Sequence, residues 1–539
     1  MENFHQLELV IMLLSVALAL TTIAQKIVLP YPILLVLGGL LLALVPEMPT
    51  VSLHPDLVFL VFLPPILWSA AYFTSWREFR ANLRPISLLA VGLVLATTIG
   101  VAMMARWLLP GMGWPEALAL GAIVSPPDAV SATAIGKRLR IPRRIVTILE
   151  GESLVNDASA LVLYRAAVAA AIGNGFDLGT TLLHFVLATV GGIAIGMLVS
   201  MAARWAMCAA RDSFTEIAIT LLSPYVAWVI GESVHASAVL ACVAGGLSMR
   251  KHFSEFSPMT RIHGRAVWDV LIFVLNGFIF ILIGLELTAL RETIPADRFG
   301  PLLVAGALVS VTAIVVRLIW VPLAAAIPRW PSPSIRRRDP LPPWQNILVA
   351  SWTGMRGIVT LAAALALPIA TDSGSPFPFR SEIILISFCV ILTTLVGQGL
   401  TLSPLIRALR LHDDHGLEQE EMLARRQAAE EGLQRLEQLA GEPWTKEPHI
   451  EQLRAHYGDR VQRFGERSTV DQECSEEMTA MFRRLRHETM SAERLHLIAL
   501  RNSGTISDEV LHRLEHELDV EAIRLGIGEQ RIMAKHVSP

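Results

Sequence analysis

The sequence predicts an all-α polytopic membrane protein of about 13 transmembrane helices, followed by a helical, acidic cytoplasmic tail. Hydrophobic residues make up 53% of the 539 positions and charged residues only 17%, which is typical of chains that cross a membrane repeatedly. Residues 1–410 carry 28 Lys and Arg against 22 Asp and Glu, whereas residues 411–539 carry 17 against 26. This shift in charge predicts a transmembrane domain over 1–410 and a separate soluble domain over 411–539.

Thirteen apolar runs are long enough to span the hydrocarbon core of a bilayer. They lie at about 6–24, 28–46, 52–73, 85–109, 116–136, 143–172, 180–207, 214–231, 234–249, 266–290, 300–328, 345–370 and 381–406. Twenty-one basic residues follow the odd-numbered runs and four follow the even-numbered ones. Because Lys and Arg gather in cytoplasmic loops, the alternation predicts an N-terminus outside and a cytoplasmic tail. The expected location is the cell inner (plasma) membrane.

The sixth run contains the stretch Glu150-Gly-Glu-Ser-Leu-Val-Asn-Asp157. On a helix, Ser153, Asn156 and Asp157 lie at i, i+3 and i+4, and so on one face, with Glu152 beside that face. A carboxylate at membrane depth is costly unless it has a partner or a function. Carboxylate, amide and hydroxyl oxygens suit hard cations such as Na+ and H+. The alternative is a structural polar cluster between helices, but three acids in eight residues exceed what packing requires.

Two runs carry signs of interrupted helices. The fifth contains Pro126-Pro127 directly before Asp128, and the twelfth contains Gly354-Met-Arg-Gly357, which adds a buried cation at Arg356. Interrupted helices at matching positions of inverted repeats mark the midplane site of a transporter. A division of the thirteen spans into six, one and six makes these two runs equivalent, and so predicts two inverted six-helix repeats whose broken helices cross. The alternative is a pair of ordinary proline or glycine kinks in a helix bundle.

Several segments resemble the motifs of one transporter family. They are Phe62-Leu-Pro-Pro-Ile-Leu67, Gly151-Glu-Ser-Leu-Val-Asn-Asp157, Glu232-Ser-Val-His-Ala-Ser237, Gly354-Met-Arg-Gly357 and Gly397-Gln-Gly-Leu-Thr-Leu-Ser-Pro404, together with the 24-residue spacing from Asp128 to Glu152. In these residues the chain resembles the monovalent cation/proton antiporters that include eukaryotic Na+/H+ exchangers and bacterial NhaP-type proteins. The resemblance covers about residues 1–410 and leaves the tail unaccounted for.

The resemblance implies a role for each matching residue. Asp157 takes either the cation or the proton, and Asp128, Asn156, Ser153 and Pro127 complete the ion site, with Na+ held at Asp157, Asp128 and Ser153. An Asn immediately before the acid is, in that family, the mark of electroneutral one-for-one exchange. The implied mechanism is elevator-type alternating access, in which spans four to six and eleven to thirteen move against a scaffold that also forms a homodimer.

Glu152 and Arg356 are expected to form a structural ion pair, because each alone is an uncompensated charge in hydrocarbon. Two departures from the family's pattern leave the preferred cation open. Pro127 precedes Asp128 where relatives have Asp-Pro, and Ser69 stands near the place where some relatives carry an acid.

The sequence therefore favours a secondary active antiporter that exchanges Na+ for H+, with Li+ or K+ as further candidate ions. A K+/H+ antiporter and a non-transporting, cation-sensing membrane protein are the alternatives. The expected partners are monovalent cations, protons, membrane lipid and a second copy of the chain. No nucleotide-binding loop or paired CxxC motif is present, so neither an enzyme, a cofactor nor a nucleic-acid partner is expected. The tail is predicted to form helices near 417–439, 448–464, 470–500 and 507–523. Its expected role is to regulate transport or to strengthen the dimer.

Overall fold

A computed structural model shows the chain as two compact units, Met1–Asp413 and Asp414–Pro539, each considered by itself below. The residues that it describes are 2–27, 30–45, 58–128, 141–173, 178–210, 212–330, 333, 337, 339–372, 374–410, 416–442, 446–465, 485, 489–500, 502–503, 510–511, 514, 517–518 and 520–521. Within these residues every regular element is a helix, and a single isolated bridge joins Ala370 to Pro376. The predicted all-α class is confirmed.

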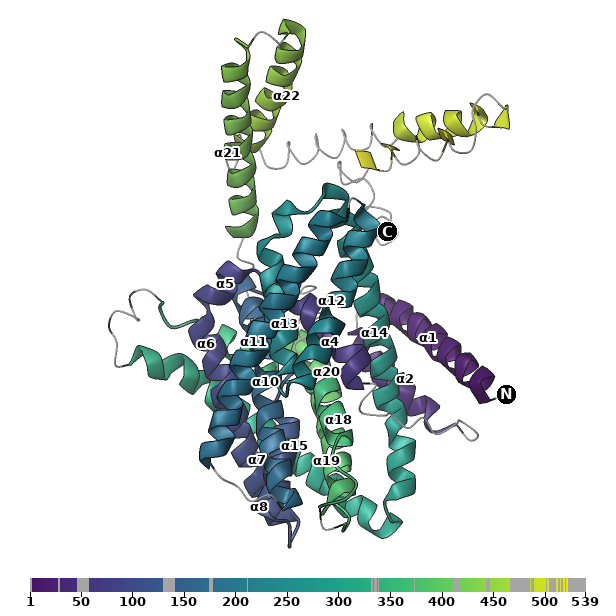
Figure 1. Cartoon of the computed structure of the whole chain (residues 1–539), viewed down its shortest axis with the longest axis vertical. Coiled ribbons are helices and arrows are strands. Elements are labelled where there is room, and N and C mark those ends of the chain that lie inside the picture. The colour runs from purple at the N-terminus through teal and green to yellow at the C-terminus, as the bar shows by residue number, and fades with distance from the viewer. Residues whose placement is uncertain are drawn as a thin grey trace. The chain divides into compact units, whose positions relative to one another are not determined.

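The first unit is a bundle of helices that differ widely in length (Figure 1). In chain order they are α1 (Glu2–Ile27), α2 (Tyr31–Leu42), η1 (Val58–Phe62), α4 (Leu63–Phe73), α5 (Trp76–Ala81), α6 (Leu83–Ser87), η2 (Leu88–Leu93), α7 (Val94–Leu108), α8 (Trp114–Val124), α10 (Arg143–Ile172), α11 (Leu178–Ala209), α12 (Ser213–Ser233), α13 (Ala238–Lys251), η3 (Phe253–Glu255), α14 (Pro258–Thr293), α15 (Ala296–Ala326), η4 (Ile327–Arg329), α17 (Trp344–Trp352), α18 (Ile358–Leu365), α19 (Arg380–Leu392), η5 (Thr393–Gln398) and α20 (Gly399–Ala408).

Seven helical segments of the described chain are long and apolar enough to cross a membrane. They are Leu83–Leu108, Arg143–Ile172, Val186–Ala209, Ser213–Ser233, Met259–Glu286, Asp297–Arg329 and Arg380–Ala408. Shorter apolar helices accompany them, and large apolar side chains such as Trp205, Phe214 and Val304 are exposed on α11, α12 and α15. An apolar exterior over this many helices is the surface that a bilayer requires. The chain is a multi-pass membrane protein, while the count of thirteen spans and the inverted repeat stay predictions.

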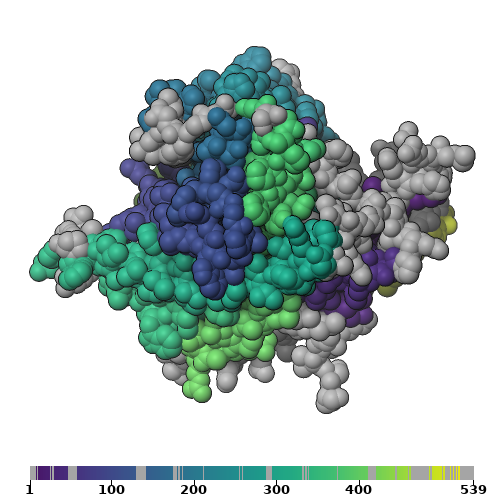
Figure 2. All heavy atoms as spheres, turned by 90° about the horizontal axis from the view of Figure 1, so that it is seen from below, coloured from purple at the N-terminus to yellow at the C-terminus, as the bar shows by residue number. Residues whose placement is uncertain are grey.

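Helices that are remote in the sequence pack directly against one another. α2 lies against α14, α4 against α13, and α15 against α19. The crossing of α2 and α14 depends on Gly39 and Gly284, because a Cβ on either would come within 2.3 Å of a backbone oxygen of the other helix. Small residues let two helices approach this closely inside a membrane. Figure 2 shows the end of the bundle where the turn between α7 and α8, in blue, lies beside the green α18–α19 region. Both α18 and α19 contact α8.

The described part of the second unit is also helical. α21 (Gly416–Leu439) and α22 (Glu447–Gly465) pack together, and Arg454 donates to both carboxylate oxygens of Glu437 at 2.7 and 2.9 Å. These two helices match the predictions for 417–439 and 448–464. The predicted helices over 470–500 and 507–523 lie partly outside the described residues, and the regulatory role of this unit stays a prediction.

Asp339, in the loop between α15 and α17, ties three parts of the first unit together. Its carboxylate accepts from Arg144 and Arg329 at 2.8 Å each and is also paired with Arg84. Partial burial raises the pKa of this carboxyl, but Arg144 and Arg329 lower it by more, so the pKa lies below its usual value. The loop is thus held to α6, α10 and η4 by the ionised form of Asp339.

We expect Asp339→Asn to lower the stability of the detergent-solubilised protein by roughly 1 kcal/mol at neutral pH, because these pairs are partly exposed. A pKa that is lower in the folded state gives a stabilisation that is complete above the unfolded-state value of about 3.9 and is lost as the pH falls through the folded-state value. The difference in thermal stability between the two proteins should therefore shrink on acidification below about pH 4. A difference that is independent of pH would show that the arginines do not act through the charge of Asp339.

Candidate functional site

Two interrupted helices meet in the interior of the first unit. α8 ends at Val124 and Ser125–Asp128 is not helical, while Thr353–Gly357 is an extended break between α17 and α18. The two breaks touch, because the backbone N–H of Asp128 donates to the carbonyl of Met355 at 2.7 Å. The prolines and glycines that predict the interruptions lie in or beside these breaks. This crossing places backbone groups that have left their helices next to charged side chains.

Arg356 stabilises the break in which it lies. Its Nε donates to the carbonyl of Val124 at 2.6 Å, a guanidinium nitrogen donates to the carbonyl of Gly354, and its backbone N–H donates to Thr394 Oγ1 at 3.0 Å. The Val124 carbonyl is the last of α8 and has no partner within its own helix. A cation at that position both satisfies the carbonyl and opposes the negative end of the helix dipole. Arg356 therefore caps one half-helix from the break in the other.

Glu152 pairs with Arg317 of α15, not with Arg356 as predicted. Arg317 donates to the two carboxylate oxygens at 2.5 and 2.9 Å, and both side chains are only 1% exposed. Arg317 also donates to the carbonyl of Ala350, near the C-terminal end of α17. The expected partner is unsuitable because the guanidinium of Arg356 is taken up by backbone carbonyls. The signal for Arg317 was present, since it is a lone charge within the apolar run 300–328 and such a charge needs an acid.

Asn156 joins α10 to the broken helix. Its Nδ2 donates to the carbonyl of Pro127 at 3.1 Å, and its side chain is fully buried. That carbonyl belongs to the break after α8, so the amide replaces a partner that the helix no longer supplies. The structure places Asn156 behind the wall of the cavity described next, in a position to hold the break in place. Its predicted part in ion binding stays a prediction.

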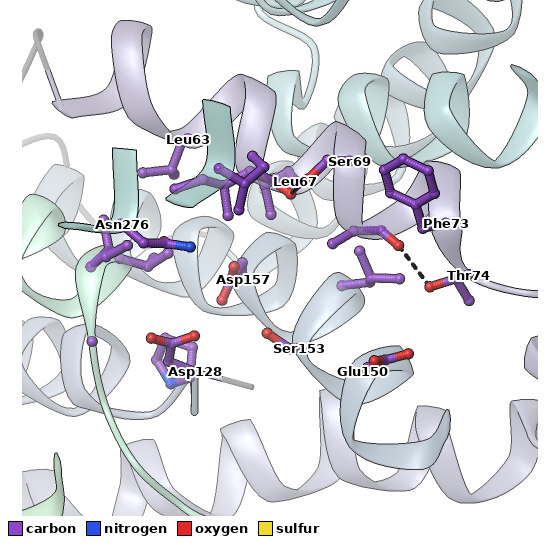
Figure 3. Close-up of a pocket in the computed structure, with 18 of the residues that line it drawn as sticks. Leu63, Leu67, Ser69, Phe73, Thr74, Asp128, Glu150, Ser153, Asp157 and Asn276 are labelled. Carbon is purple, nitrogen blue, oxygen red and sulfur yellow. Dashed lines mark hydrogen bonds between the residues drawn. The ribbon is translucent and has the colours of Figure 1, made fainter. Parts of the chain in front are cut away.

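Four of the predicted site residues line one cavity of about 500 Å³, called here the carboxylate cavity. They are Asp128, Pro127, Ser153 and Asp157, and they come from the break after α8 and from α10 (Figure 3). The facing wall comes from α2, α4 and α14. Its polar residues are Tyr31, Ser69, Thr74, Arg265, Asp269 and Asn276. The cavity thus lies between two groups of helices, with the carboxylates of Asp128 and Asp157 on one wall.

Asn276, Tyr31 and Thr74 line the cavity without being predicted from the sequence, whereas Ser69 is expected near the site. Asn276 is a single amide within the apolar run 266–290, which is the only trace that it leaves in the sequence. Tyr31 and Thr74 lie at the ends of their helices, where polar residues are common, and so carry no local signal. Glu150 also lines the cavity, on the same helix as Asp157.

The donor set of the cavity consists of oxygens. In the described part of the chain no group of three or more His, Cys, Asp and Glu side chains could hold a metal ion. Carboxylate, hydroxyl and carbonyl oxygens prefer hard cations over transition metals. The carboxylates of Asp128 and Asp157 line the same cavity and repel each other when both are ionised, and either a cation or a proton relieves that repulsion.

The chain resembles known transporters over most of its length. Residues 11–408 match the family model for the transmembrane part of sodium/hydrogen exchangers. An uncharacterised Na+/H+ exchanger of Mycobacterium tuberculosis is 33% identical over 501 residues, which is 92% of this chain and 91% of the relative. A sodium, potassium, lithium and rubidium/H+ antiporter of Bacillus pumilus is 33% identical over 404 residues, 72% of this chain and 60% of the relative.

The fold has a counterpart among solved structures. The sodium proton antiporter MjNhaP1 of Methanocaldococcus jannaschii superimposes with a TM-score of 0.59 at 18% identity, covering 76% of this chain and 99% of the other. At this identity the likeness concerns the fold alone. The match to the family model covers most of the chain and includes both interrupted helices and the acids of α10. The chain therefore belongs to the sodium/hydrogen exchanger family of secondary transporters.

Proposed function

We propose that this protein exchanges Na+ for H+ one for one across the cell inner membrane, with Asp157 as the group that carries either ion. The observation that supports this most strongly is the placement of Asp157, Asp128 and Ser153 on one wall of the carboxylate cavity, where two broken helices cross. Two carboxylates and a serine hydroxyl there supply oxygens for a small cation that has lost part of its water.

Coupling follows from the cost of an unneutralised charge. An anionic Asp157 with neither cation nor proton cannot be carried through a low-dielectric barrier, because a bare charge there costs several kcal/mol. A cation and a proton that compete for the same oxygens leave the site with the same net charge, so the exchange is electroneutral. The Glu152–Arg317 pair is neutral as a unit and does not alter this balance.

The two walls of the carboxylate cavity suggest which helices move. One wall comes from the break after α8, from α10 and from α18, and the other from α2, α4 and α14. In the elevator-type mechanism that we propose, the first group moves with α7, α15, α17, α19 and α20 against a scaffold that includes the second group. The scaffold would also form the homodimer interface. The N-terminus would lie outside and the tail in the cytoplasm, as the basic loops predict.

Measurements of proton flux in everted vesicles or proteoliposomes with an imposed pH gradient test which cation is transported. We expect Na+ and Li+ to dissipate the gradient at lower concentrations than K+, and a potassium/valinomycin clamp of the membrane potential to leave the Na+ response unchanged. A preference for K+ would favour the K+/H+ alternative, for which the broad specificity named for the Bacillus pumilus relative is a reason. A correctly inserted protein that responds to none of these cations would contradict the proposal and favour a sensor.

Gly357→Ala should reduce exchange at least tenfold while causing a smaller loss of stability. A Cβ at Gly357 would lie 2.3 Å from Oδ2 and 3.0 Å from Cγ of Asp128, so the carboxylate must move. A displacement of a functional group by about 1 Å can cost roughly a hundredfold in rate. The matched control is Gly397→Ala, where the added Cβ meets no atom within 4 Å. Equal exchange by the two variants would show that the position of Asp128 is not critical.

A further inference from the structure

Asn276 is a buried amide on the wall opposite the acids of the carboxylate cavity. It belongs to α14, is 2% exposed, and its Oδ1 is buried without a hydrogen-bond partner among the described residues. Figure 3 shows its side chain on the cavity wall near Asp157, with the amide nitrogen toward the cavity, so a rotation of the amide would turn the oxygen to the same place. Tyr31 of α2, the neighbouring helix, lines the same cavity. The amide oxygen is therefore a buried acceptor that has no hydrogen-bond partner in the described structure.

An unsatisfied buried acceptor calls for a partner. Leaving such a group unpaired costs about 1–3 kcal/mol, and buried polar groups of native proteins usually have a protein, water or ion partner. The other side chains on this wall offer little, because Leu63, Leu67 and Ile272 are apolar and the hydroxyl of Ser69 donates to the carbonyl of Ile66. An amide oxygen is a neutral, hard ligand of the kind that alkali cations accept.

We infer that Asn276 is a specificity-determining ligand, which offers its amide oxygen to the transported cation from the wall opposite Asp157. This inference rests on the proposed function. Asp128 and Asp157 supply the charge that attracts the cation, and Asn276 replaces one water of its hydration shell. Removing water costs most for the smaller ions, so loss of the ligand weakens Li+ and Na+ binding more than K+ binding.

Because the two walls belong to different groups of helices, the contact between Asn276 and the cation depends on how these groups move. The contact between Asn276 and the cation exists only while α14 faces the site. Movement of the α10 wall away from α14 breaks it. Asn276 therefore raises cation affinity on the side of the membrane to which the carboxylate cavity opens, and it has no equivalent effect on the proton, which needs no such ligand.

The test compares Asn276→Leu with Asn276→Asp in proteoliposomes. Asn276→Leu keeps the approximate size and removes the oxygen. Its half-saturating Na+ concentration should rise about five- to tenfold, the change expected from one lost ligand contact. Its preference for Na+ over K+ should fall, with a maximal rate within about twofold of the wild type. Asn276→Asp keeps an oxygen in the same place and should retain the preference. Val274→Ala, on the same helix but outside the lining of the cavity, should change neither quantity.

The outcomes separate this inference from the function on which it depends. A wild-type protein that exchanges no cation for protons contradicts the proposed function. An active wild type, together with an Asn276→Leu protein whose Na+ half-saturation and Na+/K+ preference are unchanged, contradicts the role of Asn276 alone. A fall in maximal rate with unchanged half-saturation assigns Asn276 a structural role and also overturns it. Should Asn276→Leu not insert, Asn276→Ala removes the same oxygen, and the shift in melting temperature with added Na+ reports binding in detergent.

Discussion

Asp157→Asn should abolish cation/proton exchange while leaving the protein inserted and folded. The amide has nearly the shape of the carboxylic acid but can neither take up a proton nor balance the charge of a cation. Because Asp157 is buried on α10 and lines the carboxylate cavity, the substitution removes the group that we propose both ions share. The measurement is Na+-driven proton flux in proteoliposomes, with the thermal melting temperature as a check on folding.

The control for this variant is another acid of the same cavity. Asp269 lies on α14, and its side chain is largely exposed and paired with Arg265 one turn away. Asp269→Asn removes a carboxylate from the cavity without touching the crossing, so at least half of the exchange rate should remain. Exchange by Asp157→Asn at a rate comparable to that of Asp269→Asn would remove Asp157 from its central role.

Breaking the ion pair between Glu152 and Arg317 should have the largest effect on stability. Removal of one partner from a buried pair leaves an uncompensated charge and costs about 3–5 kcal/mol, whereas replacement of both can be nearly neutral. Glu152→Gln and Arg317→Gln should therefore each lower the melting temperature markedly, and the double variant should recover part of the loss. The pair between Arg165 and Glu232 has a similar distance, 2.8 Å, but is largely exposed. Its single variants should cost less than about 1 kcal/mol.

Losses that simply add in the Glu152→Gln, Arg317→Gln double variant would show that the two side chains do not stabilise each other. A second comparison tests the corrected pairing. Combining Glu152→Gln with Arg356→Gln should recover no stability, because Arg356 is bonded to the carbonyls of Val124 and Gly354. Recovery with Arg356 and not with Arg317 would restore the partner that was expected from the sequence.

The sequence indicates the site most clearly where a residue conflicts with its surroundings. Acids in an apolar run on α10 and prolines in a spanning segment are unfavourable unless they serve a function, and both lead to the crossing. Helical spacing then puts Ser153 near Asp157, and the structure brings both to the cavity. These features depend on local chemistry, which a single sequence displays directly.

The remaining features depend on which helices are neighbours. Two buried arginines were available to Glu152, and nothing along the chain distinguishes Arg317 on α15 from Arg356 in the break. The same holds for Asn276, whose importance depends on α14 lying opposite α10 across the cavity. Asn156 shows the limit of helical spacing, because it shares a face with Asp157 but turns its amide to the carbonyl of Pro127.

The central claim is that a cation and a proton compete for Asp157, and proton release during cation binding tests it most directly. Purified protein is titrated with NaCl by calorimetry in two buffers of different ionisation enthalpy, with choline chloride as the control for ionic strength. The claim predicts that Na+ binding releases protons from the wild type and that Asp157→Asn releases none. Saturable Na+ binding to the wild type without proton release would contradict it.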